Sequence, residues 1–289
     1  MTSTIENLIE ELESDPSLDE PDRLRQRIEA LDLLEAWLMP DESARLIDPR
    51  ISQRVKAICE RLEAVNLRLY QAIRGKIQRG AGRNILLPYL SEHGSDRASG
   101  GLVNEEGYDY LDELIGGVLQ LQEPGVEAAH LEKEMVPYQP TPARHIFDMF
   151  SRAGLTEEDV LVDLGSGLGH VPLLTSICTN ARCIGIELEA AYVDCARRCA
   201  QELNLPNVAF IVQDVRAANL SDGTVFYLYT PFTGAILHEI LESLRREAMR
   251  RKIRICTLGP CTPTVAAEPW LEAHGAAEMN RIAVFSSRC

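Results

Sequence analysis

The chain has 289 residues, of which 45% are apolar and 25% charged, and its formal net charge is -15. This length and apolar content allow one substantial core and a smaller one, so we expect a main domain with an appended module. A surface this acidic repels phosphate backbones, which disfavours nucleic acid as a partner.

The negative charge is concentrated in the first half of the chain. Residues 1–135 carry 15 basic and 27 acidic side chains, whereas residues 136–289 carry 14 and 17. The acidic half favours a cationic partner, such as a lysine-bearing protein or an amine. No stretch approaches the roughly 18 consecutive apolar residues that cross a bilayer, and the polar first residues lack a secretion signal. We therefore expect a cytoplasmic protein without membrane contact.

The eight cysteines are scattered through the sequence. None forms a C-x-x-C pair, and no pair of histidines lies beside the closest-spaced ones, Cys195 with Cys199 and Cys256 with Cys261. We therefore expect buried free thiols, with neither disulfides nor a metal site.

Helical spacing dominates residues 1–135, which we expect to form an all-helical module. Apolar residues at helical spacing over 19–39 predict a first helix that Pro40 ends. A second begins with Asp48 as the N-cap and Pro49 at the first helical position. Its heptad stripe consists of Ile51, Val55, Ile58, Leu62, Val65 and Leu69. The stripe could form a dimeric coiled coil, but it is shorter than three heptads, which favours packing on the helix before it. A further helix is predicted over 107–121.

From Asp159 onward, apolar runs alternate with helical segments. Strands are predicted at 160–164, 183–187, 208–212, 224–229, 253–258 and 282–286. Such alternation is typical of a mostly parallel sheet covered on both faces, so we expect a doubly wound, Rossmann-like α/β domain over residues 136–289. Ligands of such folds bind at the carboxyl ends of the strands.

The first of these strands runs into a glycine-rich turn. It reads Asp163-Leu164-Gly165-Ser166-Gly167-Leu168-Gly169-His170, in which glycines allow a sharp bend and a close approach of the backbone to a ligand. A dinucleotide fingerprint would place its third glycine at position 170, where His170 stands instead.

Acidic and aromatic residues follow the next three strands. The second strand ends at Glu187, whose two carboxylate oxygens can accept hydrogen bonds from a pair of ribose hydroxyls. The third is followed by Asp214-Val215, where the carboxylate can accept from an amino group of a base. The fourth ends in Tyr229-Thr230-Pro231-Phe232. Taken alone, Glu187 could instead be an acid exposed at the end of a strand, and Asp214 could instead cap the turn that follows it.

In this order and spacing, the four strand ends resemble those of class I S-adenosylmethionine-dependent methyltransferases over residues 136–289. The resemblance implies S-adenosylmethionine as the cofactor. It places the cofactor against Asp163, Gly165, Ser166, Gly167, Gly169, His170, Glu187, Asp214 and Val215. Our hypothesis for the methyl acceptor is a pocket formed by Tyr229, Thr230, Pro231 and Phe232.

The segment Tyr138-Gln139-Pro140-Thr141-Pro142 before the glycine turn resembles a second pattern. It is similar to the Y-x-P-T-P segment of seven-strand protein-lysine methyltransferases, such as the ATP-synthase c-subunit lysine methyltransferase family. The turn itself is similar to that of histone-lysine methyltransferases of the disruptor-of-telomeric-silencing type. The resemblance implies that Tyr138 and Thr141 lie against the cofactor. Thr230-Pro231-Phe232 departs from the Asn-rich segment of the histone enzymes, and the helical module matches neither family.

Three functions agree with this pattern. The leading hypothesis is methylation of a nitrogen, such as that of a protein lysine, by in-line displacement, with the acidic module recruiting a basic partner. The second is N- or O-methylation of a small molecule beneath a helical lid, and the third is a binding protein that keeps the fold without activity. We expect His145, His170 and His238 to be structural rather than to act as a base, with His170 touching the cofactor.

Overall fold

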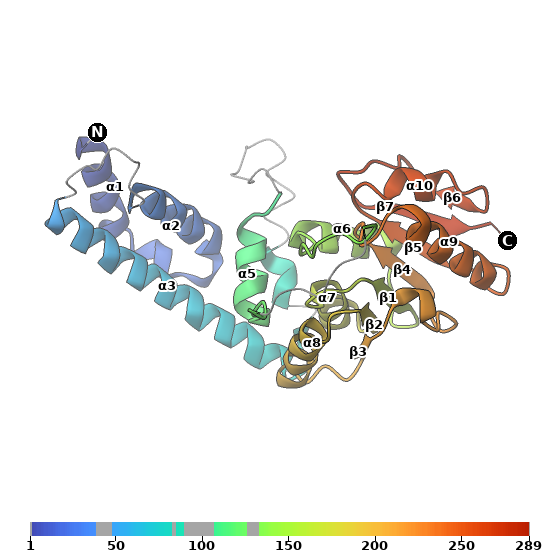
Figure 1. Ribbon diagram of the computed structural model, residues 1–289. Coiled ribbons are helices and arrows are strands. Elements are labelled where there is room, and N and C mark those ends of the chain that lie inside the picture. The colour runs from blue at the N-terminus through green and yellow to red at the C-terminus, as the bar shows by residue number, and fades with distance from the viewer. Residues whose placement is uncertain (1, 39–47, 83–84, 90–106, 126–132, 289) are drawn as a thin grey trace. The chain divides into compact units, whose positions relative to one another are not determined.

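The computed structural model describes residues 2–38, 48–82, 85–89, 107–125 and 133–288. The chain divides into two compact units (Figure 1), residues 1–75 with 88–119, and residues 76–87 with 120–289. The sequence predicts a domain boundary between residues 135 and 136, and that boundary stays a prediction.

The first unit is helical, as its spacing predicts. It contains α1 (Thr2–Ser14), the 3-10 turns η1 (Pro16–Asp19) and η2 (Pro21–Arg23), α2 (Leu24–Leu38), α3 (Pro49–Ile77) and α5 (Tyr110–Leu119). The carboxylate of Asp48 accepts from the backbone N–H of Arg50 at 2.8 Å, so it caps α3 as expected.

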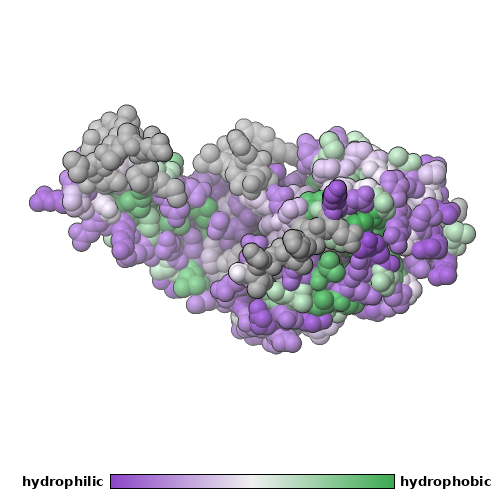
Figure 2. All heavy atoms as spheres, in the orientation of Figure 1, coloured by the Kyte–Doolittle hydropathy of each residue, from purple (hydrophilic) through white to green (hydrophobic). Residues whose placement is uncertain are grey.

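The heptad stripe of α3 is buried within this unit except at its last residue, Leu69, which is half-buried. Val55 and Leu62 are fully buried, and they belong to a hydrophobic cluster that includes Ile9 of α1 and Leu34 of α2. On the face drawn in Figure 2, the described side chains are mostly hydrophilic. Packing inside one chain is therefore confirmed, because the stripe has partners there. A homodimer through these helices stays a prediction.

The second unit contains a seven-stranded sheet in the order β3-β2-β1-β4-β5-β7-β6. The strands are β1 (Val160–Leu164), β2 (Arg182–Glu187), β3 (Val208–Val212), β4 (Val225–Leu228), β5 (Arg254–Thr257), β6 (Leu271–Ala273) and β7 (Ala283–Ser287). Strands β1 to β5 run parallel, and β7 pairs antiparallel with both β5 and β6. The predicted doubly wound fold is confirmed; the sequence had not indicated β6.

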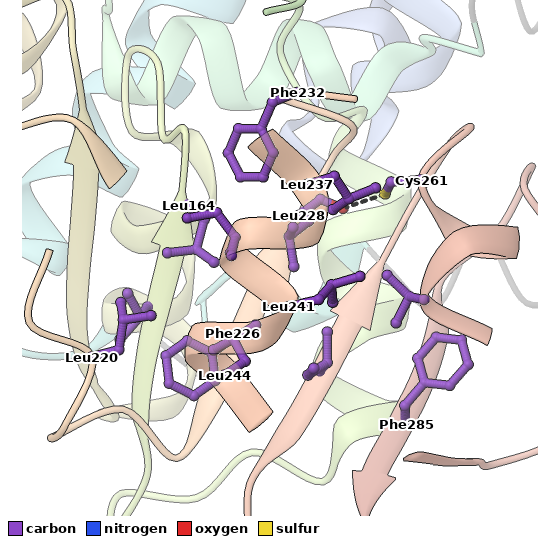
Figure 3. Close-up of a cluster of buried hydrophobic side chains, with 14 of the residues drawn as sticks. Leu164, Leu220, Phe226, Leu228, Phe232, Leu237, Leu241, Leu244, Cys261 and Phe285 are labelled. Atoms are coloured by element: carbon purple, nitrogen blue, oxygen red, sulfur yellow. Dashed lines mark hydrogen bonds between the residues drawn. The ribbon is translucent and has the colours of Figure 1, made fainter. Parts of the chain in front are cut away.

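Helices cover both faces of this sheet. They are α6 (Ala143–Ala153), α7 (His170–Thr179), α8 (Ala190–Glu202), α9 (Gly234–Ala248) and α10 (Thr262–Ala266), with the 3-10 turn η4 (Val215–Ala217) after β3. On one face, Phe226 and Leu228 of β4 pack on Leu237 and Leu241 of α9 in a large apolar cluster (Figure 3). Helix α7 packs against β1 and β2, and α6 packs against α7.

The strand order reverses at β1, which pairs with β2 on one side and β4 on the other. In open parallel sheets, ligands bind beyond the carboxyl ends of the strands at such a reversal. Asp163 is in register with Gly185 of β2 and with Tyr227 of β4, so the predicted acid stands at this point.

Among the helices in the described ranges, none is long and apolar enough to cross a membrane. The predicted cytoplasmic location stays a prediction. The seven cysteines that the structure describes are free thiols, and all but Cys59 are buried, as expected for core residues.

Candidate functional site

The glycine turn follows β1 and bends back over the end of β2. The backbone N–H groups of Gly165 and Ser166 both donate to the carbonyl oxygen of Ile186, at 2.9 and 3.0 Å. Gly165, Gly167 and Gly169 have φ angles of 90°, 50° and 86°, in the left-handed region that favours glycine. The turn therefore needs these residue types for its own geometry.

Glu187 ties the end of β2 to this turn. One carboxylate oxygen accepts from the N–H of Gly167 at 2.8 Å, and the other accepts from the N–H groups of Leu188 and Glu189 at 2.7 and 2.9 Å. The first two strand ends are thus adjacent, as predicted. A carboxylate has about four lone-pair positions, so the predicted ribose contact would share these oxygens with the backbone.

Asp163 lies at the end of β1, almost completely buried. Burial raises the pKa of Asp163 well above its ordinary value, and the nearby negative charge of Glu187 raises it further. The carboxyl of Asp163 therefore stays neutral at pH values at which an exposed aspartate is ionised.

This shift predicts how the stability of the protein depends on pH. Because the folded-state pKa is raised, the contribution of Asp163 is fully present below the pKa of the unfolded chain, about 3.9, and is lost as pH rises through the folded-state pKa. Asp163→Asn should therefore gain stability over the wild type as pH rises. Thermal unfolding without added ligand, from pH 4 to pH 8, measures this difference, and melting curves that stay parallel would contradict the shift.

Tyr138 covers the glycine turn. Its ring lies so close to Gly167 that a Cβ atom at that position would stand 2.0 Å from the ring. Its hydroxyl is hydrogen-bonded to Nδ1 of His170 at 3.1 Å. The structure therefore brings together Tyr138, Gly167 and His170, as the sequence predicts, and leaves their contact with a cofactor as a prediction.

Thr141 is buried, and its hydroxyl is hydrogen-bonded to that of Tyr227 at 3.0 Å. It therefore fixes the chain before α6 to the sheet. The contact of Thr141 with the cofactor stays a prediction.

Asp214 follows β3 and makes local hydrogen bonds. Its carboxylate accepts from the backbone N–H of Arg216 at 2.8 Å and from that residue's guanidinium at 2.6 Å. These bonds lower the pKa of Asp214, the largest cause being the side chain of Arg216. Asp214 thus caps η4, as the alternative to a ligand contact predicted. Its contact with a base stays a prediction, and so does the contact of the half-buried Val215 with the cofactor.

The Tyr229–Phe232 segment is held in place by contacts with other parts of the second unit. The hydroxyl of Thr230 donates to the carbonyl oxygen of Leu258 and accepts from the N–H of Cys261, each at 3.1 Å. The carbonyl oxygen of Pro231 accepts from the N–H of Val136 at 3.1 Å. The ring of Phe232 points into the apolar cluster beside Leu164 and Leu228 (Figure 3).

We expected all four of these residues to face a methyl acceptor. Phe232 is only 4% exposed and belongs to the apolar core. Tyr229 is half-buried, and the backbone of Thr230 has a φ of 43°, a strained value for a β-branched residue. Whether any of the four touches an acceptor stays a prediction.

The structure also assigns a role to Glu134, which the sequence did not indicate. Its carboxylate accepts from the N–H of Ile236 at 3.0 Å at the beginning of α9, and its carbonyl oxygen accepts from the N–H of Thr233 at 2.8 Å. We call residues 133–142 the lead-in segment. It is held by Glu134 on α9, by Val136 on Pro231, by Tyr138 on the glycine turn and by Thr141 on β4.

The histidines are poor candidates for a general base. Burial lowers the pKa of both His145 and His170 to about 4, well below the value near 7 that suits a base at neutral pH. Nδ1 of His238 is hydrogen-bonded to the carbonyl oxygen of Gly234, within α9. These positions agree with structural roles for all three.

A comparison with known protein families finds a match within the second unit. The model of a family described as "Histone methylation protein DOT1" matches residues 136–220, a span that contains Tyr138, the glycine turn, Glu187 and Asp214. No curated protein matches the chain.

Solved structures with similar coordinates include three methyltransferases. An RNA methyltransferase from Salinibacter ruber in complex with S-adenosyl-L-homocysteine is 25% identical, covering 52% of this chain and 92% of that one, with a TM-score of 0.40. A putative methyltransferase, yhhF, from Escherichia coli is 14% identical (53% and 92%, TM-score 0.43). A precorrin-6y C5,15-methyltransferase from Geobacter metallireducens is 18% identical (53% and 92%, TM-score 0.39).

Proposed function

We propose that residues 136–289 form a class I S-adenosylmethionine-dependent methyltransferase domain that methylates a nitrogen, with a lysine of a basic protein as the acceptor. The observation that carries the proposal is the joined pair of strand ends, in which the N–H of Gly167 donates to Glu187 at 2.8 Å beneath the ring of Tyr138. A glycine turn beside a strand-end acid at the reversal of strand order is an arrangement suited to an adenosyl group.

The residues at this point fit that cofactor. A side chain at Gly165 or Gly167 would collide with Pro231 or Tyr138, so these two residues must be glycine for Pro231 and Tyr138 to pack on the turn. The hydroxyl of Ser166 is buried and has no hydrogen-bond partner within the described part of the chain. Such a group is costly to leave unpaired, which favours a ligand or water beside it.

We propose that Glu187 and the glycine turn hold the cofactor while Tyr138 covers it. S-adenosylmethionine supplies an activated methyl group on a sulfonium. The chain's own residues then need to position the acceptor for in-line displacement, in which a nitrogen lone pair forms the new N–C bond as the S–C bond breaks. Little acid-base machinery is required, which agrees with two histidines whose pKa values are about 4.

A lysine acceptor must lose its proton before it attacks, because its reference pKa is about 10.4. Desolvation beside the half-buried Tyr229 and the backbone of Thr230 would favour the neutral amine. Two observations support a basic protein as the partner. The first 135 residues carry 27 acidic and 15 basic side chains, and the family that matches residues 136–220 is described as one of histone methylation.

The experiment is to follow a labelled methyl group from S-adenosylmethionine. The full chain is incubated with an extract of its source organism, separated into protein and small-molecule fractions. We expect label in protein, on lysine by mass spectrometry, and none with Glu187→Ala. Label in the small-molecule fraction alone would contradict the proposal and support the small-molecule alternative. No label in either, with S-adenosylhomocysteine still bound, would support the binding protein.

A further inference from the structure

Tyr192, on the first turn of α8, lies against Tyr138. The two ring centroids are 5.1 Å apart and the ring planes are inclined by 54°. Such a tilted pair is within the range in which aromatic rings attract each other. The contact joins α8, which follows β2, to the lead-in segment, which passes over the glycine turn after β1.

The position of this pair follows from its neighbours. Tyr138 lies on Gly167, and the N–H of Gly167 is bound to Glu187. Tyr192 stands five residues after Glu187 along the chain. Burial raises the pKa of its hydroxyl, and the negative charges of Glu123, Glu187 and Glu189 raise it further. The two rings therefore bridge the ends of β1 and β2, directly beside the residues that fit an adenosyl group.

A second segment holds Tyr192 in place. Its hydroxyl donates to a carboxylate oxygen of Glu123 at 3.4 Å, and the thiol of Cys195, one turn further along α8, donates to the carbonyl oxygen of Gln122 at 3.3 Å. Residues 122 and 123 therefore lie along α8. Glu123 is a positioning residue in this arrangement, because it orients the ring through the hydroxyl.

We propose that Tyr192 is a further cofactor-binding residue, which forms with Tyr138 a two-ring aromatic cover over the adenosyl and sulfonium groups. The inference depends on the proposed function, because it concerns the cofactor of that reaction. Two rings exclude water from the site, and the face of an aromatic ring attracts a cation such as a sulfonium. This attraction predicts that the cover favours S-adenosylmethionine over its uncharged product.

The test is calorimetric titration of the full chain with S-adenosylmethionine and, separately, with S-adenosylhomocysteine. Tyr192→Ala is expected to raise both dissociation constants about tenfold, because the apolar cover is lost. Tyr192→Leu keeps apolar volume without a ring, so it should weaken S-adenosylmethionine about threefold more than S-adenosylhomocysteine. Tyr192→Phe should bind both ligands within about threefold of the wild type, since only the hydrogen bond to Glu123 is removed.

Asp194→Ala is the matched control, because Asp194 is an exposed residue on the same helix whose carboxylate pairs with Arg197 at 3.5 Å. It should bind both ligands as the wild type does. If a thermal unfolding curve shows that Tyr192→Ala is not folded, the affinities of Tyr192→Leu decide between the outcomes. Wild-type affinity in both variants, or equal losses in Tyr192→Phe and Tyr192→Ala, would overturn the aromatic cover alone. A wild-type chain that binds neither ligand would overturn the proposed function itself.

Discussion

Replacing Gly167 by alanine is expected to weaken the binding of S-adenosylhomocysteine by about 100-fold, or about 2.7 kcal/mol. The new Cβ would stand 2.0 Å from the ring of Tyr138 at a φ of 50°. Either the ring leaves the turn or the turn changes shape, and the second change also breaks the bond from Gly167 to Glu187. Isothermal titration calorimetry measures the loss.

Gly154→Ala is the matched control for this variant. Gly154 has a φ of 58° and caps α6, but a Cβ at that position would meet no atom within 4 Å. It should therefore lose about 1 kcal/mol of folding stability from backbone strain and keep its affinity. Equal affinities of Gly167→Ala and Gly154→Ala would contradict the assignment of the turn as a ligand cradle.

Asp159→Ala is expected to destabilise the second unit by about 3 kcal/mol, which urea unfolding measures. Asp159 lies just before β1 and forms an ion pair with Arg254 of β5. Its carboxylate also accepts from the N–H of Thr156 and the hydroxyl of Thr224, both at 2.9 Å. Removing it leaves a guanidinium without its charge partner in a site that is mostly buried, which costs more than losing an exposed pair.

The same carboxylate gives this prediction a pH dependence. Burial alone would raise the pKa of Asp159, but the hydrogen bonds from Arg254, Thr156 and Thr224 outweigh it and lower the pKa. Its stabilisation is therefore present above the unfolded-state pKa, about 3.9, and is lost as pH falls through the folded-state pKa. The deficit of Asp159→Ala should shrink in acid.

The exposed pair of Arg182 and Asp222, 3.9 Å apart, provides the control. Asp222→Ala should change stability by less than about 1 kcal/mol. If Asp222→Ala lowered the free energy of unfolding as much as Asp159→Ala does, the contribution of the buried ion pair and its hydrogen bonds would be contradicted.

Much of the fold could be predicted because periodic patterns report burial directly. Strands β1 and β3 begin and end where the apolar runs do, and α3 begins at the predicted Pro49. The predicted stripe stops at Leu69, but the helix continues to Ile77, and the apolar face continues with it, because Ile73 and Ile77 are both buried. Strand β6 reads Leu-Glu-Ala, too short for a period to show, and it forms by pairing with β7.

Site residues could be predicted only where a single stretch of sequence contains the whole pattern that identifies them. The glycine turn and Glu187 are of this kind, since a strand end and a spacing define them. Glu134, Tyr192 and Glu123 are not, because their partners lie far along the chain and only the folded sheet brings them close. The burial of Phe232 was not predicted either, because its neighbours in the core lie on other elements.

The most direct test is a crystal structure of the full chain grown with saturating S-adenosylhomocysteine. We expect the ribose hydroxyls at the carboxylate of Glu187, the ligand over the turn at Gly167, and the base beside Asp214 and Val215. A ligand bound away from the ends of β1 and β2, or a saturated crystal with no ligand there, would contradict the account.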